Sequence, residues 1–179
     1  MKIINKLIDN QYDKSTITHT RKIARAVLIN ENNEVCLLHV LGDDDFGHRD
    51  YYETPGGGVN ENEEIDKAVI REIKEETGYN SIIIQELGIV EDYYNLIHRH
   101  NINHYYLLKA TSFEKEELEE YEKGIIDSKI WVDIDTAISL YENMNKDKLE
   151  ILVKNRELPI LKMVKEIIKG GKEDECLWN

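Results

Sequence analysis

The 179-residue sequence has little cysteine, few basic residues for its acidic content, and no long apolar run. Its two cysteines, Cys36 and Cys176, stand far apart and form no zinc-binding pattern. Cys36 lies in an apolar run and is expected to be buried. No apolar run approaches the length of a membrane span. The polar start over residues 1–6 does not resemble a signal peptide, so we expect a cytoplasmic protein.

Basic residues are outnumbered, because 23 Lys and Arg against 36 Asp and Glu give a formal net charge of −13. A nucleic-acid polymer or an anionic membrane would require basic patches, so neither is expected as the main partner. A small anionic substrate is compatible with this charge if a metal ion bridges it to the protein.

Apolar residues make up 41% of the chain and recur along its whole length, which predicts a globular protein rather than a disordered one. The length is typical of one domain, and the sequence contains no repeat or linker. We therefore expect a single domain over residues 1–179, with residues 170–179 as a frayed tail. A monomer and a homodimer are both compatible with the sequence.

One glutamate-rich stretch, from Gly57 to Tyr79, carries the clearest chemical signal. Glu72, Glu75 and Glu76 occur at positions i, i+3 and i+4, so an α-helix places them on one face. Carboxylates so close repel one another, which predicts a cation between them. Carboxylate oxygens are hard ligands that suit Mg²⁺ or Mn²⁺. For these three glutamates taken alone, a charged and solvated helix face is the alternative.

Both ends of this helix are marked by residues that do not suit a helix interior. Residues 54–58, Thr-Pro-Gly-Gly-Gly, must precede it, because Pro lacks an N–H group and Gly costs backbone entropy. Asn60 or Asn62 can cap the N-terminus, and Gly78 can end the helix. The helix is therefore expected over about residues 61–77.

The stretch resembles the Nudix box, in which glycines, glutamates and an arginine occur at fixed spacings. The matching positions are Gly57, Glu63, Arg71, Glu72, Ile73, Glu75, Glu76, Gly78 and Tyr79. Only Tyr79 departs from the pattern, because an aliphatic residue is usual there, and we expect it to be a packing position. The Pro-Gly-Gly that comes just before also looks like the family's usual approach to the box. A match at so many fixed positions makes the resemblance specific.

The resemblance implies an α/β fold, the Nudix-type α/β/α sandwich with a mixed β-sheet. It implies a hydrolase that uses Mg²⁺ or Mn²⁺ to cleave the pyrophosphate bond of a nucleoside diphosphate linked to another moiety. That substrate could be a nucleoside triphosphate, ADP-ribose or a nucleotide sugar. The metal ligands that it implies are the Gly56 carbonyl, Glu72, Glu75 and Glu76. Glu72 is alternatively the general base that activates water, while Arg71 and Glu63 orient the other residues.

Three other functions are compatible with the same fold. A non-catalytic nucleotide-binding sensor is disfavoured, because such proteins typically lose box glutamates and all are present here. Isomerisation of an isoprenoid diphosphate would need a catalytic cysteine, and Cys36 and Cys176 are poor candidates. Removal of an RNA cap is disfavoured by the acidic net charge.

Residues 91–101 separate two predicted strands and combine aromatic, histidine and arginine side chains. Aromatic rings can stack on a base and a guanidinium can bind a phosphate, so this segment is a candidate for substrate recognition. The candidate substrate-binding residues are Tyr93, Tyr94, His98 and Arg99. A zinc site is an alternative, and the alternating side chains of a hairpin are another. The histidines of that possible zinc site are His98, His100 and His104.

A second acidic run covers residues 114–122. Members of the family often place one further functional glutamate well after the box, and Glu120 and Glu122 are the candidates here. The other glutamates of the run are expected to face solvent.

The remaining elements follow from periodicity and turn residues. Strands are predicted at residues 21–30, 34–41, 51–54, 81–90, 103–110 and 129–133. Helices are predicted at residues 134–141, 146–154 and 159–170, the last starting at Pro159. Residues 42–47 are predicted to form an acidic loop, and residues 1–19 to add an edge strand or wrap around the domain. Asp133 or Asp135 is expected to cap the first of these helices.

Overall fold

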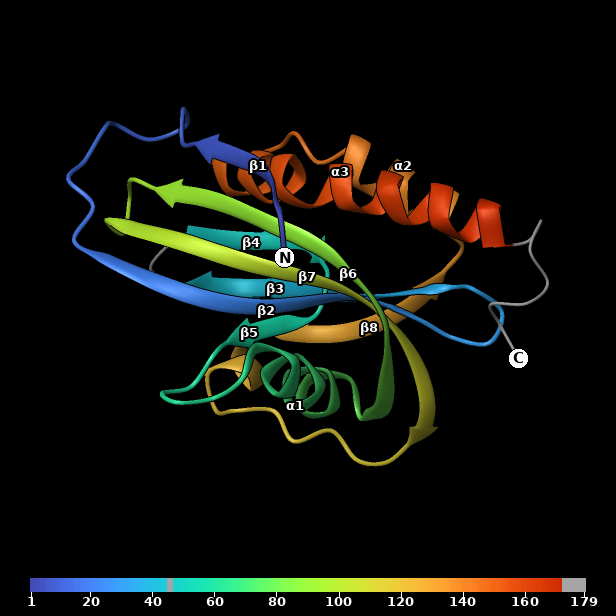
Figure 1. Ribbon diagram of the computed structural model, residues 1–179. Coiled ribbons are helices and arrows are strands. Elements are labelled where there is room, and N and C mark those ends of the chain that lie inside the picture. The colour runs from blue at the N-terminus through green and yellow to red at the C-terminus, as the bar shows by residue number, and fades with distance from the viewer. Residues whose placement is uncertain (45–46, 172–179) are drawn as a thin grey trace.

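A mixed β-sheet separates two helical layers in the computed structural model, which describes residues 1–44 and 47–171 (Figure 1). Helix α1 (Ile65–Thr77) covers one face of the sheet. Helices α2 (Ile134–Glu142) and α3 (Lys148–Gly171) cover the other. The predicted α/β/α sandwich is confirmed. No helix in these residues is both long enough and apolar enough to cross a bilayer.

The sheet combines parallel and antiparallel pairs. Its strands are β1 (Ile3–Ile8), β2 (His19–Ile29), β3 (Val35–Asp44), β4 (Gly47–Glu53), β5 (Gly56–Gly58), β6 (Tyr79–Tyr94), β7 (Arg99–Phe113) and β8 (Ile126–Val132). They are ordered β1-β6-β7-β2-β3-β4, while β5 pairs with β2 and β8 with β3. The pairs β1–β6 and β2–β7 are parallel, and the others are antiparallel. Strand β1 thus supplies the edge strand expected from the first residues of the chain.

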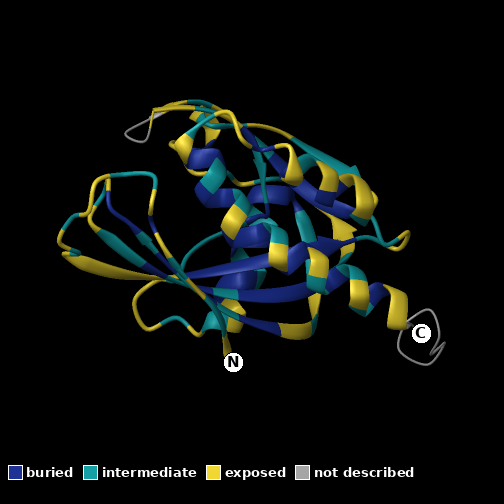
Figure 2. Cartoon of the chain, turned by 90° about the horizontal axis from the view of Figure 1, so that it is seen from above, coloured by how far each residue is buried: buried dark blue, intermediate teal, exposed yellow. Residues whose placement is uncertain are grey.

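Strand β2 lies in the middle of the sheet, and every residue from Ile23 to Ile29 is buried (Figure 2). Its alternate side chains belong to two hydrophobic cores because the sheet is covered on both faces. Val27 packs in the core under α2 and α3. Leu28 packs in the core under α1, together with Cys36, which is buried as expected. The two helical layers are therefore fixed on opposite sides of the same strand.

Several strands are longer than predicted. Strand β6 extends to Tyr94 and β7 begins at Arg99, so most of residues 91–101 belong to a hairpin, as one of the alternatives for this segment predicted. Residues 42–44 and Gly47 are also strand, which corrects the predicted loop; Asp45 and Phe46 lie outside the described residues. Backbone pairing explains both differences, because it requires no apolar side chains.

The two helices predicted after residue 146 are one helix, α3, with Pro159 in its interior. Proline has no N–H to donate to the carbonyl four residues earlier, which normally ends or kinks a helix. The helix continues because buried side chains on both sides of Pro159, such as Val153 and Ile160, pack in the same core. Helix α3 ends at Gly171, and the rest of the predicted tail lies outside the described residues.

Replacing Pro159 by alanine should stabilise the protein by about 1–3 kcal/mol, because the exposed residue regains a helical hydrogen bond. Urea denaturation at neutral pH would measure the free energy of unfolding. Asn155→Ala is the matched control, since Asn155 is exposed in the same helix and differs from alanine only in helix propensity. An unchanged or lowered stability for Pro159→Ala, beside a small gain for the control, would show that the proline fits this helix without cost.

Candidate metal centre and substrate cavity

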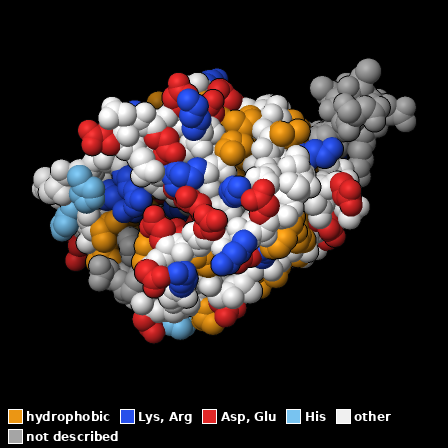
Figure 3. All heavy atoms as spheres, turned by 90° about the horizontal axis from the view of Figure 1, so that it is seen from below, with side chains coloured by type: hydrophobic (Ala, Val, Ile, Leu, Met, Phe, Trp, Pro, Cys, Tyr) orange, Lys and Arg blue, Asp and Glu red, His pale blue; other side chains and the backbone are white. Residues whose placement is uncertain are grey.

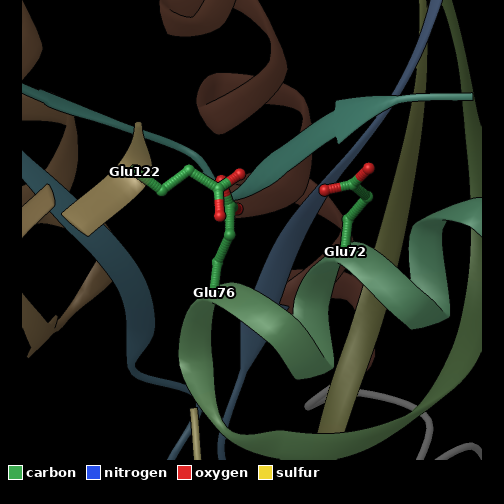
Figure 4. A group of neighbouring side chains, drawn as sticks. All are labelled: Glu72, Glu76 and Glu122. Carbon is green, nitrogen blue, oxygen red and sulfur yellow. The ribbon is translucent and has the colours of Figure 1, made fainter. Parts of the chain in front are cut away.

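Three buried glutamates from two elements meet beside the central sheet. Glu72 and Glu76 project from α1, and Glu122 projects from the short 3-10 helix η1 (Glu122–Gly124) (Figure 4). Each offers one carboxylate oxygen, and these oxygens all lie within 4.8 Å of one another. Within residues 1–44 and 47–171, this is the one group of three or more such side chains that could hold a metal ion. The alternative zinc site of three histidines is therefore not formed there.

Helix α1 presents its two glutamates at i and i+4, as the spacing predicts. It begins at Ile65 and not near residue 61. Asn62 has a φ of 63°, so it belongs to a turn, and neither Asn60 nor Asn62 provides the predicted cap. Gly78 ends the helix as predicted, with a φ of 75° and its N–H donated to the Lys74 carbonyl.

The glycines of β5 allow these carboxylates to lie directly against the backbone. The Gly56 N–H donates to Glu76 Oε2 at 2.6 Å. A Cβ at Gly57 would collide with the Glu72 carboxylate, and a Cβ at Gly56 would collide with the backbone of β2. Gly56 also has a φ of 143°, which few other residues adopt. The glycine triplet therefore provides the space that the glutamate cluster occupies.

The Arg71 side chain forms hydrogen bonds with every glutamate of the box except Glu76. Its guanidinium donates to Glu63 at 2.8 and 2.9 Å, to Glu72 at 2.8 Å and to Glu75 at 2.8 Å. The contact with Glu75 is an i, i+4 pair on α1. Glu75 is paired with Arg71 and lies outside the three-carboxylate group. Tyr79, at the position that departs from the box, packs edge-on against Trp131 with ring centroids 5.3 Å apart, as a packing residue should.

Burial and like charge both disfavour ionisation of the cluster. Burial, followed by the neighbouring Glu53, raises the pKa of Glu76 well above its ordinary value, although the Gly56 N–H opposes this. Burial also raises the pKa of Glu72, and Arg71 partly offsets it. The hydrogen bond from Arg71 lowers the pKa of Glu63. A cation placed between Glu72, Glu76 and Glu122 would offset both the burial and the mutual repulsion.

A cavity of about 270 Å³ opens beside the cluster. Glu76, Glu122 and the three glycines of β5 form part of its wall. Tyr121 also lines it, and the Tyr121 hydroxyl donates to Glu122 Oε1 at 3.0 Å. The remaining polar side chains of the wall are Arg21, Arg25, Arg49, Glu53 and Arg99. The cavity thus has acidic side chains next to a larger basic group.

The structure separates the candidate substrate-binding residues. Arg99 lines the cavity. Tyr94 is buried and its hydroxyl accepts a hydrogen bond from Arg156 at 3.0 Å. Tyr93 stacks on His100 with ring centroids 4.4 Å apart, and His98 occupies the tight turn between β6 and β7 with a φ of 54°. Of the four candidates, only Arg99 lines the cavity beside the carboxylate cluster.

The two later glutamates are also distinguished. Glu120 is exposed and pairs with Lys123. Glu122 is buried in the cluster, so it is the one whose position suits a metal centre. The sequence interpretation missed Arg21, Arg25 and Arg49. Alternation of Arg21, Ile23 and Arg25 along a predicted strand was a usable signal, because such residues share one face.

The cysteine that isomerase chemistry would need is absent from the described site. Cys36 is buried under α1, and burial raises the pKa of its thiol to about 12. A thiol in that state is a poor nucleophile. Cys176 lies outside the described residues.

Comparisons with known proteins agree with this geometry. A family model described as the NUDIX domain matches residues 19–154. Among solved structures, the chain is similar to a NUDIX hydrolase from Nitrosomonas europaea, with 19% identity and a TM-score of 0.59 over 77% of this chain and 88% of that one. It is also similar to a MutT NUDIX hydrolase from Burkholderia pseudomallei, with 18% identity and a TM-score of 0.52 over 66% and 86% of the two chains.

A MutT protein from Methanosarcina mazei Go1 is 21% identical, with a TM-score of 0.51 over 72% of this chain and 85% of that one. At these identities the structural likeness shows the fold alone. A search of curated proteins found no match. The family model covers most of the chain and includes the glutamate helix, the glycine triplet and Glu122. The chain therefore belongs to the Nudix hydrolase family, and it is an enzyme of the class that acts on phosphorus-containing acid anhydrides.

Proposed function

We propose that this enzyme uses Mg²⁺ or Mn²⁺ to hydrolyse the pyrophosphate bond of a nucleoside diphosphate linked to another moiety. The observation that carries the proposal is the group of three buried carboxylates at a cavity lined by arginines. Carboxylates supply the hard oxygen ligands of these ions, and guanidinium groups bind phosphate oxygens. The carboxylates and the arginines together support a site for a metal-bound diphosphate.

The residues fit a divalent ion on physical grounds. Three carboxylates share a buried space, and the glycines of β5 keep that space free of side chains. When bound, the ion supplies positive charge to the phosphates and lowers the pKa of a coordinated water. The proposed ligands are Glu72, Glu76 and Glu122, with Glu75 and the Gly56 carbonyl as further candidates.

The protein's own groups have separate proposed tasks. Glu72 is a candidate for the general base as well as for a ligand, because its carboxylate belongs to the group that would hold the ion and its water. Arg71 fixes the Glu72 carboxylate through a 2.8 Å hydrogen bond and is itself held by Glu63. Arg25, which lies opposite Gly56 and lines the cavity next to the cluster, is the candidate that orients the phosphates at the cleaved bond through its N–H donors.

A hydrolysis screen in which the nucleotide products are separated by anion-exchange chromatography tests the proposal. The purified protein is incubated with Mg²⁺, Mn²⁺ or EDTA and with nucleoside triphosphates, ADP-ribose, nucleotide sugars or dinucleoside polyphosphates, and with a nucleoside monophosphate as the phosphate monoester. We expect cleavage of at least one class with either metal, and none in EDTA. Turnover that persists in EDTA would contradict the metal requirement. Turnover confined to phosphate monoesters would contradict cleavage of a pyrophosphate bond.

A further inference from the structure

Four of the six arginines in the chain line the one cavity beside the carboxylate cluster: Arg21, Arg25, Arg49 and Arg99. The chain as a whole is strongly acidic, with a formal net charge of −13. Basic side chains also gather around a hollow on the face shown in Figure 3, beside acidic ones. Positive charges repel when they are brought together, so this gathering requires either acidic partners or a bound anion.

Nearby carboxylates offset the charge of only some of the four cavity arginines. Arg25 lies 3.7 Å from Glu53 and 3.6 Å from Glu157, and it donates to the Thr54 carbonyl at 3.0 Å. By contrast, no carboxylate of the described residues lies within 4.0 Å of the Arg21 or Arg99 side-chain nitrogens.

One buried nitrogen of the Arg99 side chain also has no hydrogen-bond acceptor among the described residues. This nitrogen is Nε. A buried donor without an acceptor costs free energy, and an anion in the cavity would provide one. Arg21 and Arg99 are therefore the two cavity arginines whose charge an anionic ligand would best offset.

The register of the sheet places this pair away from the metal centre. In the pairing of β2 with β5, Arg25 lies opposite Gly56 and Ile23 lies opposite Gly58. The Gly56 N–H donates to the Glu76 carboxylate of the cluster. The Arg21 guanidinium lies against Gly58, because a Cβ there would collide with it. Two residues along a strand separate Gly58 from Gly56, roughly 6–7 Å. A group bound at Arg21 therefore sits farther along the cavity than one bound at Glu76.

We propose that Arg21 and Arg99 form a subsite for a further phosphate group of the substrate, outside the metal centre. The planar guanidinium fork binds phosphate through paired hydrogen bonds. The subsite favours substrates with a phosphate beyond the cleaved pyrophosphate, such as a nucleoside triphosphate or a nucleoside diphosphate linked to a phosphorylated sugar. It disfavours nucleotide sugars that end in hydroxyl groups. This choice of substrate class rests on the proposed function, whereas binding of the anion does not.

Binding of inorganic tripolyphosphate in EDTA tests the subsite without metal or turnover. Isothermal titration calorimetry would compare the wild-type protein with Arg21→Gln and Arg99→Gln. Loss of a charged hydrogen-bond donor should raise Kd about tenfold or more in each variant. Lys67→Gln is the control, because Lys67 is an exposed cation on α1 that pairs with Glu64 and does not line the cavity. Unchanged affinity in both arginine variants would overturn the proposal.

Arg99 is partly buried, so its variant is useful only if its melting curve matches the wild type. Arg21 is exposed at its strand position and provides the second, independent variant. Gly58→Ala adds a third, because its methyl group would displace the Arg21 guanidinium without removing the charge. We expect it to weaken tripolyphosphate binding in the same direction as Arg21→Gln.

Steady-state kinetics then separates this inference from the proposed function. Arg99→Gln should raise KM about tenfold for a nucleoside triphosphate and leave KM for a nucleotide sugar with a neutral end unchanged. Equal losses for both substrates would overturn the subsite while hydrolysis stands. Loss of tripolyphosphate binding in a protein that hydrolyses neither substrate would support the subsite and contradict the proposed function. Comparing the triphosphate with a phosphorylated-sugar substrate identifies which phosphate the arginines bind.

Discussion

Glu76→Gln should lower turnover by more than about a hundredfold and leave the protein folded. Glu76 is the box glutamate most deeply involved in the cluster, since it accepts the Gly56 N–H and contributes an oxygen to the three-carboxylate group. Replacing a carboxylate ligand with a neutral amide removes the charge that holds a divalent ion, and changes even outside the ligand shell commonly cost 10–100-fold. Initial rates with saturating Mg²⁺, on the substrate found by the screen, would measure the loss.

The same substitution should leave thermal stability in EDTA equal to that of the wild type or higher. Burial and the carboxylates of Glu53, Glu72 and Glu122 all oppose ionisation of Glu76, so a neutral side chain removes an unfavourable interaction. The amide oxygen can still accept the Gly56 N–H. Opposite effects on activity and stability are typical of residues that serve function.

Glu120→Gln is the matched control for this experiment. It removes one negative charge from the same acidic segment, but the residue is exposed and pairs with Lys123 outside the cluster. Its turnover should stay within about twofold of the wild type, as expected for a solvent-screened charge. Near-normal turnover of Glu76→Gln would contradict a metal-binding role. A large fall in its melting temperature would instead assign Glu76 to the stability of the fold.

The part of the site that could be predicted from the sequence is the part with local geometry. Glu72 and Glu76 are one helical turn apart, so the helix period alone places them together. Gly78 marks the end of that helix through its left-handed backbone. Glu122 joins them from 46 positions along the chain, and only tertiary contacts decide that it, and not Glu120, is buried.

Those contacts involve groups that no periodicity reveals. The Glu119 N–H donates to Glu122 Oε2 at 2.8 Å, and the Tyr121 hydroxyl donates to its other oxygen. Arg99 and Arg21 likewise reach one cavity because β7 and β2 are paired in parallel, which the sequence does not specify. The part of the site that depends on the period of one helix was therefore predicted. The part that depends on contacts between distant segments was missed.

The fold was likewise predicted where local patterns determine it and missed where tertiary contacts do. Alternation and apolar runs predicted the positions of the central strands and of α1. They failed for α3, where Pro159 suggested a helix start, and for the polar ends of β6 and β7. In both places tertiary packing or backbone pairing overrides the local preference of the residues.

Glu157→Gln should destabilise the protein by about 3–5 kcal/mol, because it leaves a buried cation without its partner. Glu157 is fully buried in α3 and accepts hydrogen bonds from Arg156 at 2.6 Å, from the Tyr141 hydroxyl at 2.6 Å and from the Thr54 N–H at 2.8 Å. An amide can replace the acceptor toward Thr54 and Tyr141. Its NH₂ group would then face the Arg156 guanidinium, donor against donor.

Urea denaturation at neutral pH would measure this loss. Glu166→Gln is the control in the same helix, because Glu166 is exposed and pairs with Lys169. Exposed pairs contribute at most about 1 kcal/mol, so the control should unfold close to the wild-type midpoint. A loss for Glu157→Gln no larger than that of the control would show that the buried ions are compensated without Glu157.

The dependence of this loss on pH tests its electrostatic origin. Burial alone raises the pKa of Glu157, but Arg156 and Arg25 outweigh it and hold the pKa below its ordinary value of 4.5. A carboxylate whose pKa is lowered by folding contributes stability that is fully present above 4.5 and is lost as pH falls through the lower folded value. The difference in unfolding free energy between wild type and Glu157→Gln should therefore be constant between pH 7 and pH 5 and shrink in more acidic solution. A difference that stays constant down to full acid unfolding would mean that packing, and not the charge of Glu157, ties α3 to the Thr54 segment that leads into the glycines of the site.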